Sequence, residues 1–309
     1  MTDATQTAAD AKRRDSASDF DTLAPSPREL MRRRARSHWG LIIGLSIIAI
    51  FLLAAIFAGV LAPHDPYAQT LSHRLADPVW GPKGSWNHIL GTDALGRDVL
   101  SRLMYGARLS LYISFTAALI AAVIGVSLGI AGGYFGGKID SLVVYIINVK
   151  LALPVFLVAL SIAAITGGTV TVMILLLGFL TWDRYAIVTR SLTQQMRDQD
   201  FIMSSLAAGS SHMRIIFRDI LPNLMNHIIV IVSLDMAVII LIEAALSFLG
   251  LGIRPPTPSW GLMISEARAM MFFKPHLIMV PGIAIFILVM AINMAGDGIR
   301  DVTAPEGRG

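Results

Sequence analysis

The chain has 309 residues, of which 55% are hydrophobic and only 15% charged, with a formal net charge of +4 and a mean hydropathy of +0.66. A soluble domain carries about 25% charged residues, so this composition excludes an ordinary soluble protein and indicates one that crosses a membrane several times. The chain has no cysteine, which excludes disulfides and thiolate metal sites.

The N-terminal region differs from the rest of the chain. Residues 1–37 are rich in Ala, Asp, Ser and Thr and have no apolar period, which predicts a disordered cytoplasmic tail. The basic cluster Arg32–Arg36 then precedes an apolar run from Leu41 to Leu61. This run covers ~32 Å as a helix, enough for a bilayer core of ~30 Å. We therefore expect an uncleaved first transmembrane helix at 38–62, with its N-terminus inside.

Further apolar stretches predict five more spans, at about 110–131, 139–165, 170–188, 228–249 and 277–295. Six spans place both termini on one side of the membrane. The expected order is then an external loop (63–109), a core (110–300) with five transmembrane helices and a cytoplasmic loop at 190–226, and a cytoplasmic tail (301–309). The predicted fold class is an all-α membrane protein.

The distribution of basic residues supports this orientation, although not at every position. The inner side carries the Arg32–Arg36 cluster, and inner loops are enriched in such residues. Other basic residues expected inside are Lys138, Arg190, Arg197, Arg214, Arg218 and Arg300. The external loop also carries Arg97, Arg102 and Arg108, but long loops are translocated largely regardless of their charge.

Three charged residues within the predicted spans are candidates for the translocation path. They are Lys150, Asp235 and Glu243, and ionisable residues within a membrane are costly enough to indicate function. The alternative is structural: Lys150 faces the bundle or snorkels, and Glu243 lies near the outer end of its helix. Lys150 and Asp235 would neutralise each other if their helices touch.

Two motifs resemble enzyme signatures but lack the required context. Residues 132–138 nearly match a phosphate-binding loop, yet Ile139 stands where Ser or Thr is needed and no soluble strand precedes them. Residues 125–129 match G-x-S-x-G, but they lie within a predicted span, where Gly125, Gly129 and Gly133 favour close helix packing instead. The histidines are scattered and no H-E-x-x-H occurs, so we expect no metal site and no catalytic residue.

The loop at 190–226 interrupts the apolar pattern and is the strongest clue to function. Its sequence predicts two short amphipathic helices that are hinged at Gly209 and followed by Leu221-Pro222. Phe201, Met203 and Leu206 would be apolar anchors for a groove on a partner protein. The alternative, an amphipathic segment lying on lipid, fits the periodicity equally well.

This loop resembles the signature of ABC importer permeases, EAA-x3-G-x9-I-x-L-P. Gly209 and Leu221-Pro222 match the signature in spacing. The chain departs from it at residues 203–205, where Met-Ser-Ser replaces Glu-Ala-Ala, and at Asp219, which replaces Ile. Residues 88–111, 243–261 and 281–301 are similar to the C-type permease subunits of the dipeptide/oligopeptide/nickel group. The resemblance covers about residues 30–303.

The resemblance implies a type I ABC importer permease fold in the bacterial inner membrane. The implied partners are a homologous B-type permease subunit, two cytoplasmic ABC ATPase subunits and an external substrate-binding protein. ATP and Mg²⁺ would bind to the ATPases, so this chain would need no cofactor and would not be an enzyme itself. The residues implied to couple it to an ATPase are Phe201, Met203, Ser204, Ser205, Leu206, Ala207, Gly209, Leu221 and Pro222.

Several alternatives remain at this point. Within the resemblance, the substrate is a dipeptide or a longer peptide, or else glutathione or nickel. Outside it, an ATP-independent channel or secondary transporter should show an internal repeat with broken helices, and no such repeat is seen. An intramembrane enzyme is disfavoured because no catalytic constellation is found.

Overall fold

The computed structural model describes residues 35–303, and the regular structure in that range is helical apart from one isolated β-bridge between Thr92 and Asp98. The helices are α3 (Trp39–Ile56), α4 (Ala58–Leu61), η1 (Leu71–His73), α5 (Val99–Phe135), α6 (Gly137–Leu151), α7 (Val155–Thr166), α8 (Val170–Leu180), α9 (Asp183–Arg197), α10 (Asp200–Ala207), α11 (His212–Ile215), the π-turn η2 (Ile216–Ile220), α12 (Leu221–Phe248), α13 (Trp260–Ala267), η3 (Arg268–Met270) and α14 (His276–Thr303). The predicted all-α class is confirmed. Most of the predicted N-terminal tail, and residues 304–309, lie outside the described range.

Five helical stretches within residues 35–303 are long and apolar enough to cross a membrane, namely Trp39–Ile56, Val99–Phe135, Val170–Arg197, His212–Phe248 and His276–Thr303. A sixth is obtained if α6 and α7 count as one span. The prediction of a single helix at 139–165 is wrong, because α6 and α7 are bent by 74° where they meet. Pro154 lies in the break, and proline both lacks an amide donor and disfavours helical backbone in the residue before it.

The second span starts earlier than its apolar run suggests. Helix α5 begins at Val99, so residues 99–109 are helical and not part of a loop. Asp98 is the N-cap, and its side chain accepts a hydrogen bond from the amide of Ser101. A capping carboxylate satisfies one of the free amides of the first turn, which fixes the helix start independently of the membrane boundary.

Helix α5 lies at the centre of the bundle and packs against α3, α8, α9 and α12. The close helix packing predicted for Gly125, Gly129 and Gly133 is observed, and the helix that they face is α9. A Cβ on Gly125 would collide with the carbonyl oxygen of Trp182, and one on Gly133 would lie 2.6 Å from the carbonyl oxygen of Arg190. The glycines therefore serve close helix packing.

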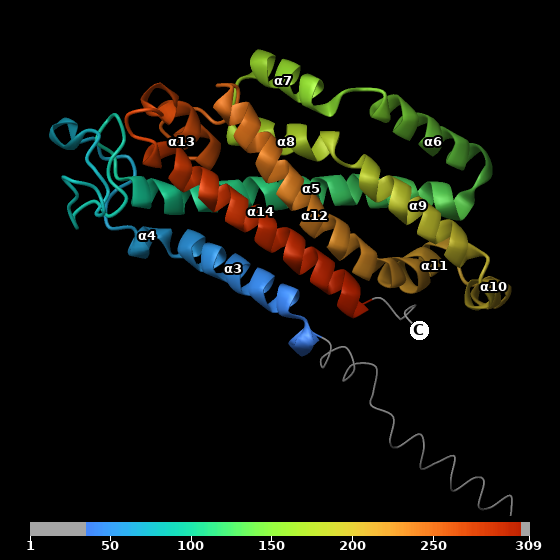
Figure 1. The fold of residues 1–309 in the computed structure, drawn as a ribbon. Coiled ribbons are helices and arrows are strands. Elements are labelled where there is room, and N and C mark those ends of the chain that lie inside the picture. Colours follow the sequence, from blue (N-terminus) through green and yellow to red (C-terminus); the bar gives the residue numbers. More distant parts are fainter. Residues whose placement is uncertain (1–34, 304–309) are drawn as a thin grey trace, which may run out of the picture.

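The connecting segments gather at the two ends of the bundle (Figure 1). We call one the loop end, which holds residues 62–98 and α13, and the other the hinge end, which holds α10 and α11. The two ends of the described chain also meet at the hinge end, where His38 Nε2 lies 3.2 Å from Asp301 Oδ2. This grouping agrees with the alternation of sides expected for six spans.

The loop end is held together by internal polar contacts. Arg97 and Arg102 are buried, and both contact Glu266 of α13 at 2.8 Å. Each also pairs with Asp93, Arg97 through its Nε at 2.6 Å. These arginines were expected in an external loop, against the charge rule for such loops, and the structure shows that both have acidic partners.

Candidate coupling site and buried charges

Helix α10 carries the predicted anchors at the hinge end. Its side chain Ile202 is 2% exposed and packs into a cluster with Ile215, Ile220 and neighbouring apolar residues, so one face of the helix is fixed. Phe201, Met203 and Leu206 are 44%, 54% and 45% exposed. The helix is thus held on one face while apolar side chains project on both sides of that face.

A cavity of about 420 Å³ opens beside α10. Met203 and Leu206 line it together with Phe135, the last residue of α5, while Arg197 and Asp198 add charge to its lining. Tyr134 and His212 also line it, and the Tyr134 hydroxyl lies 2.9 Å from His212 Nδ1. Sequence reasoning missed Phe135 because it belongs to a transmembrane helix and not to the loop.

Gly209 is the hinge between α10 and α11. Its φ is +80°, a left-handed conformation that side chains with a Cβ adopt only at a cost, although a Cβ itself would meet no atom within 4 Å. The amide of Gly209 donates to the carbonyl of Leu206, and that of Ser210 donates to the carbonyl of Ser205. Glycine is needed here for its backbone conformation and not for space.

Two of the departures from the family signature contact each other. Ser205 is half-buried, and its hydroxyl donates to Asp219 Oδ2 at 3.2 Å. This hydrogen bond joins α10 to the π-turn η2 across the hinge. Ser204 and Ala207, the remaining predicted residues of α10, are exposed.

Leu221 and Pro222 begin α12, directly after the π-turn. Proline lacks an amide donor and crowds the carbonyl four residues before it, and the helix directly before it is π-helical, with the amide of Leu221 donating to the carbonyl of Ile216. The side-chain amide of Asn223 donates to the carbonyl oxygen of Asp219 at 2.6 Å, which satisfies one backbone group in this turn. Leu221 and Pro222, which were predicted to end the loop, are therefore the first residues of α12, and η2 joins α12 to α11 without a break in the helical backbone.

The structure pairs Lys150 with an acidic residue that sequence reasoning overlooked. Lys150 Nζ donates to Asp183 Oδ1, and both side chains are largely buried. Asp183 and Arg184 lie within the predicted span 170–188, so the predicted spans hold more charged residues than the three named from the sequence. Asp183 stands in the first turn of α9, where a negative charge is favoured.

The expectation that Lys150 would neutralise Asp235 is wrong. Asp235 is 1% exposed and accepts a hydrogen bond from the Tyr185 hydroxyl at 3.3 Å. Its Oδ1 has no partner among the described residues. Helix α9 therefore contributes one partner to each buried charge, Asp183 to Lys150 and Tyr185 to Asp235.

Glu243 lies where α12 meets the turn that follows it. Its Oε1 accepts a hydrogen bond from the Ser247 hydroxyl at 2.7 Å, and Ser247 Oγ in turn accepts one from the amide of Ile253 at 3.3 Å. Glu243 is 2% exposed. Its observed contacts thus organise the loop end, and a role in the path stays a prediction for Glu243, as it does for Lys150 and Asp235.

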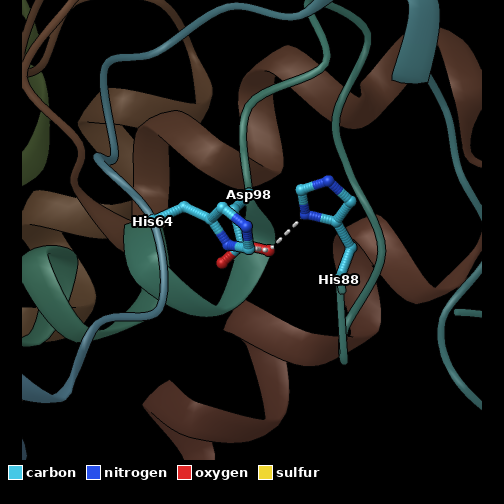
Figure 2. A group of neighbouring side chains, drawn as sticks. All are labelled: His64, His88 and Asp98. Carbon is cyan, nitrogen blue, oxygen red and sulfur yellow. Dashed lines mark hydrogen bonds and ion pairs between the residues drawn. The ribbon is translucent and has the colours of Figure 1, made fainter. Parts of the chain in front are cut away.

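At the loop end, the structure gathers three side chains that the sequence scatters. His64, His88 and Asp98 each place one potential metal-ligand atom within 4.8 Å of the other two. Figure 2 shows both imidazoles next to the carboxylate, with a hydrogen bond between His88 and Asp98. No pattern of sequence spacing could have indicated this cluster, because its members come from the start, the middle and the end of an irregular segment.

Two family models together match most of the chain. Residues 121–308 match the model of the binding-protein-dependent transport system inner membrane component. Residues 26–78 match the N-terminal transmembrane domain of oligopeptide transport permease C.

Curated relatives are similar over most of their length. The dipeptide transport system permease protein DppC of Escherichia coli (strain K12) is 43% identical over 86% of this chain and 89% of its own. The di/tripeptide transport system permease protein DppC of Pseudomonas aeruginosa (strain UCBPP-PA14) is 35% identical over 94% and 96%. The glutathione transport system permease protein GsiD of Shigella flexneri serotype 5b (strain 8401) is 40% identical over 91% of both chains.

One solved structure shares the fold at low sequence identity. It is an inward-facing form of the MetNI methionine ABC transporter, with a TM-score of 0.54 and 18% identity over 66% of this chain and 97% of that one. At this identity the likeness concerns the fold alone, and it confirms the predicted architecture of an ABC importer permease.

Proposed function

Because the chain belongs to the family of binding-protein-dependent transport system inner membrane components, we propose that it forms the translocation path of an ATP-driven importer of di- and oligopeptides. The observation that carries the coupling part of this proposal is α10, whose exposed Met203 and Leu206 border a cavity at the hinge end. An amphipathic helix that lays exposed apolar side chains into a groove on its partner is a common mode of docking between proteins.

The coupling loop would transmit the movement of an ATPase subunit to the spans. Its contacts suit this task, because Ile202 packs α10 onto Ile215 and Ile220, which lead directly into α12. A displacement of α10 would be passed through these packed side chains to α11 and η2, which continue into α12 without an intervening loop. Alternating access would then follow from rocking of the spans, as in other transporters whose packed elements have two arrangements.

The proposed assembly needs a homologous permease subunit, two ATPase subunits that hydrolyse ATP, and a binding protein that delivers the substrate. Hydrolysis belongs to the separate ATPases, so this chain is not proposed as an enzyme. It would lie in the bacterial cytoplasmic membrane with the hinge end, and hence its N-terminus, inside. Of the buried charges, Lys150 and Asp235 are the residues we propose near the path.

Reconstitution tests both the energy source and the substrate. Proteoliposomes holding this chain, its partner permease, the ATPases and the binding protein should accumulate labelled dipeptide only with ATP. Uptake that needs no ATPase would contradict the proposal and favour a channel or secondary transporter.

Glutathione is a second candidate substrate, supported by the 40% identity with the GsiD permease. Both substrates would use the same machinery, so a competition experiment is needed to tell which of the two is transported. Unlabelled dipeptide should suppress the uptake of labelled dipeptide, whereas excess glutathione or Ni²⁺ should not. Stronger suppression by glutathione or by Ni²⁺ would overturn the peptide assignment while leaving the ATP-driven mechanism intact.

A further inference from the structure

His64, His88 and Asp98 at the loop end form a donor set suited to a divalent transition metal ion. The Nδ1 atoms of the two histidines lie 3.8 Å (His64) and 2.9 Å (His88) from Asp98 Oδ1. Zinc bonds to nitrogen and oxygen are ~2.0–2.2 Å long, so the ligands of a tetrahedral ion lie ~3.3 Å apart. The observed distances bracket this value, and side-chain shifts of about half an ångström would close the difference.

The two imidazoles already face the carboxylate together. Their ring centroids are 4.6 Å apart and the ring planes differ by 32°, so the two rings lie close to each other beside Asp98 (Figure 2). His64 has a side-chain exposure of 39%, whereas Asp98 has one of 1%. The cluster is thus anchored by a buried carboxylate and open to solvent at His64, which gives an ion a way in.

A second layer of hydrogen bonds fixes the carboxylate. Asp98 Oδ2 accepts hydrogen bonds from the amide and from the hydroxyl of Ser101, both at 2.8 Å. The hydroxyl of Ser101 also accepts one from the backbone amide of His64 at 3.1 Å. Ser101 therefore orients Asp98 Oδ1 towards the histidines and holds the backbone of His64 beside it, as outer-shell partners do in metal sites.

From this geometry we propose that His64, His88 and Asp98 bind one divalent transition metal ion of the Zn²⁺, Co²⁺ and Ni²⁺ class, with water in the remaining position. Two imidazoles and one carboxylate suit these ions, whereas Ca²⁺ and Mg²⁺ prefer oxygen ligands throughout. The alternative to a metal ion is a simple hydrogen bond between His88 Nδ1 and Asp98 Oδ1, whose observed distance is 2.9 Å.

The ion would act as a clamp on the loop end. His64 follows α4 closely, His88 lies within the irregular segment, and Asp98 begins α5. Binding would therefore join the start, the middle and the end of residues 62–98. Linking distant points of an irregular segment removes conformational freedom from its unfolded state. The ion is proposed as a resident of this chain and not as the transported substrate.

Metal titration of the isolated full-length chain tests this proposal without any transport assay. The chain should be purified in nanodiscs through a tag that contains no histidine, and then titrated with Zn²⁺. We expect one ion per chain, and a loss of affinity of roughly tenfold or more in His64→Ala. His73→Ala is the matched control, because the exposed His73 ring packs edge-on against His88 at a centroid distance of 5.7 Å but is not one of the three ligands.

A ligand-specific signature separates direct binding from an indirect effect on folding. Asp98 also caps α5, so its replacement would disturb the helix start, and the test relies on His64 instead. The chain has no cysteine, so His64→Cys introduces the only thiol. With Co²⁺, this variant should gain a near-ultraviolet thiolate-to-metal absorption. The proposal is overturned if that band is absent, if wild type binds no Zn²⁺, or if His64→Ala and His73→Ala bind it equally.

Discussion

The loop end and the hinge end of this bundle are stabilised in different ways. At the loop end, Arg97, Arg102 and Glu266 form buried ion pairs, and Trp260 is fully buried. At the hinge end, α10 is held by one buried face while Met203 and Leu206 project outwards. The loop end has a buried core of its own, although Trp86, Phe272 and Phe273 stay exposed there, whereas α10 is held on one face only and leaves Met203 and Leu206 for another protein to cover. Substitutions should therefore affect folding at the first end and coupling at the second.

Trp260→Ala should give the largest effect on stability. Trp260 packs against Gly106 of α5 and against the ring of Phe51, and its Nε1 donates to the carbonyl of Leu103 at 2.9 Å. Removing a buried tryptophan costs about 3–5 kcal/mol. Chemical unfolding in detergent would measure the loss. Trp86→Ala is the control, because Trp86 is 80% exposed and its removal should change stability by less than about 0.5 kcal/mol.

The double substitution of Met203 and Leu206 by alanine should show the opposite pattern. Both side chains are about half exposed, so the unfolding free energy should change little. Loss of two central anchors typically costs about 2 kcal/mol or more of binding free energy, a factor of about 30. We expect ATPase binding and ATP-driven uptake to fall by at least that factor, measured by co-purification and by uptake in proteoliposomes. If the double variant lost stability but still bound the ATPase, α10 would serve folding and not coupling, which would contradict the contrast between the two ends.

Gly209→Val should have an intermediate effect. A left-handed conformation costs a residue with a Cβ about 1–2 kcal/mol, and a β-branched residue is the least tolerant. Because a Cβ at this position meets no neighbour, the strain falls on the hinge alone. ATP hydrolysis should continue while uptake declines. Gly209→Asn should retain more uptake, because asparagine tolerates this conformation, and equal uptake by both variants would argue against a hinge that depends on φ.

The smallest effect is expected for Asp77→Asn at the loop end. Asp77 pairs with Lys274, and this hydrogen bond, followed by the attraction of the ammonium charge, holds the pKa of the carboxyl below its usual value. A lowered pKa stabilises the folded state above the usual pKa, and that contribution is lost as pH falls through the lowered one. The unfolding free energy of the wild type should exceed that of Asp77→Asn by less than about 1 kcal/mol. The difference in unfolding free energy should be constant from about pH 8 to 5 and should shrink as pH falls below about 4.

Apolar run length and glycine spacing were sufficient to predict much of the fold. They indicated six spans, close helix packing at Gly125 and Gly133, and a hinge at Gly209. The bend between α6 and α7 was missed although Pro154 marked it, because hydropathy stays high across the break. The pairing of Lys150 with Asp183 was missed because Asp183 was overlooked among the charges of span 170–188, and because span composition does not reveal which helix faces meet.

The two candidate sites differ in how far the sequence could reveal them. The predicted anchors of α10 lie in one short periodic segment, so the sequence alone could indicate Met203 and Leu206 as candidates. The cavity beside them also needs Phe135, which only the fold brings near. The cluster of His64, His88 and Asp98 depends wholly on the path of an irregular segment.

The most direct test of the account asks whether an ATPase subunit covers α10. Met203→Cys and Trp86→Cys each introduce a single thiol, because the chain has no other cysteine. Both positions are exposed, so a maleimide should label both in the isolated chain. We predict that adding the ATPase subunits protects Met203→Cys and leaves Trp86→Cys fully reactive. Equal labelling of Met203→Cys with and without the ATPases, in an assembly that transports, would contradict the proposed coupling site.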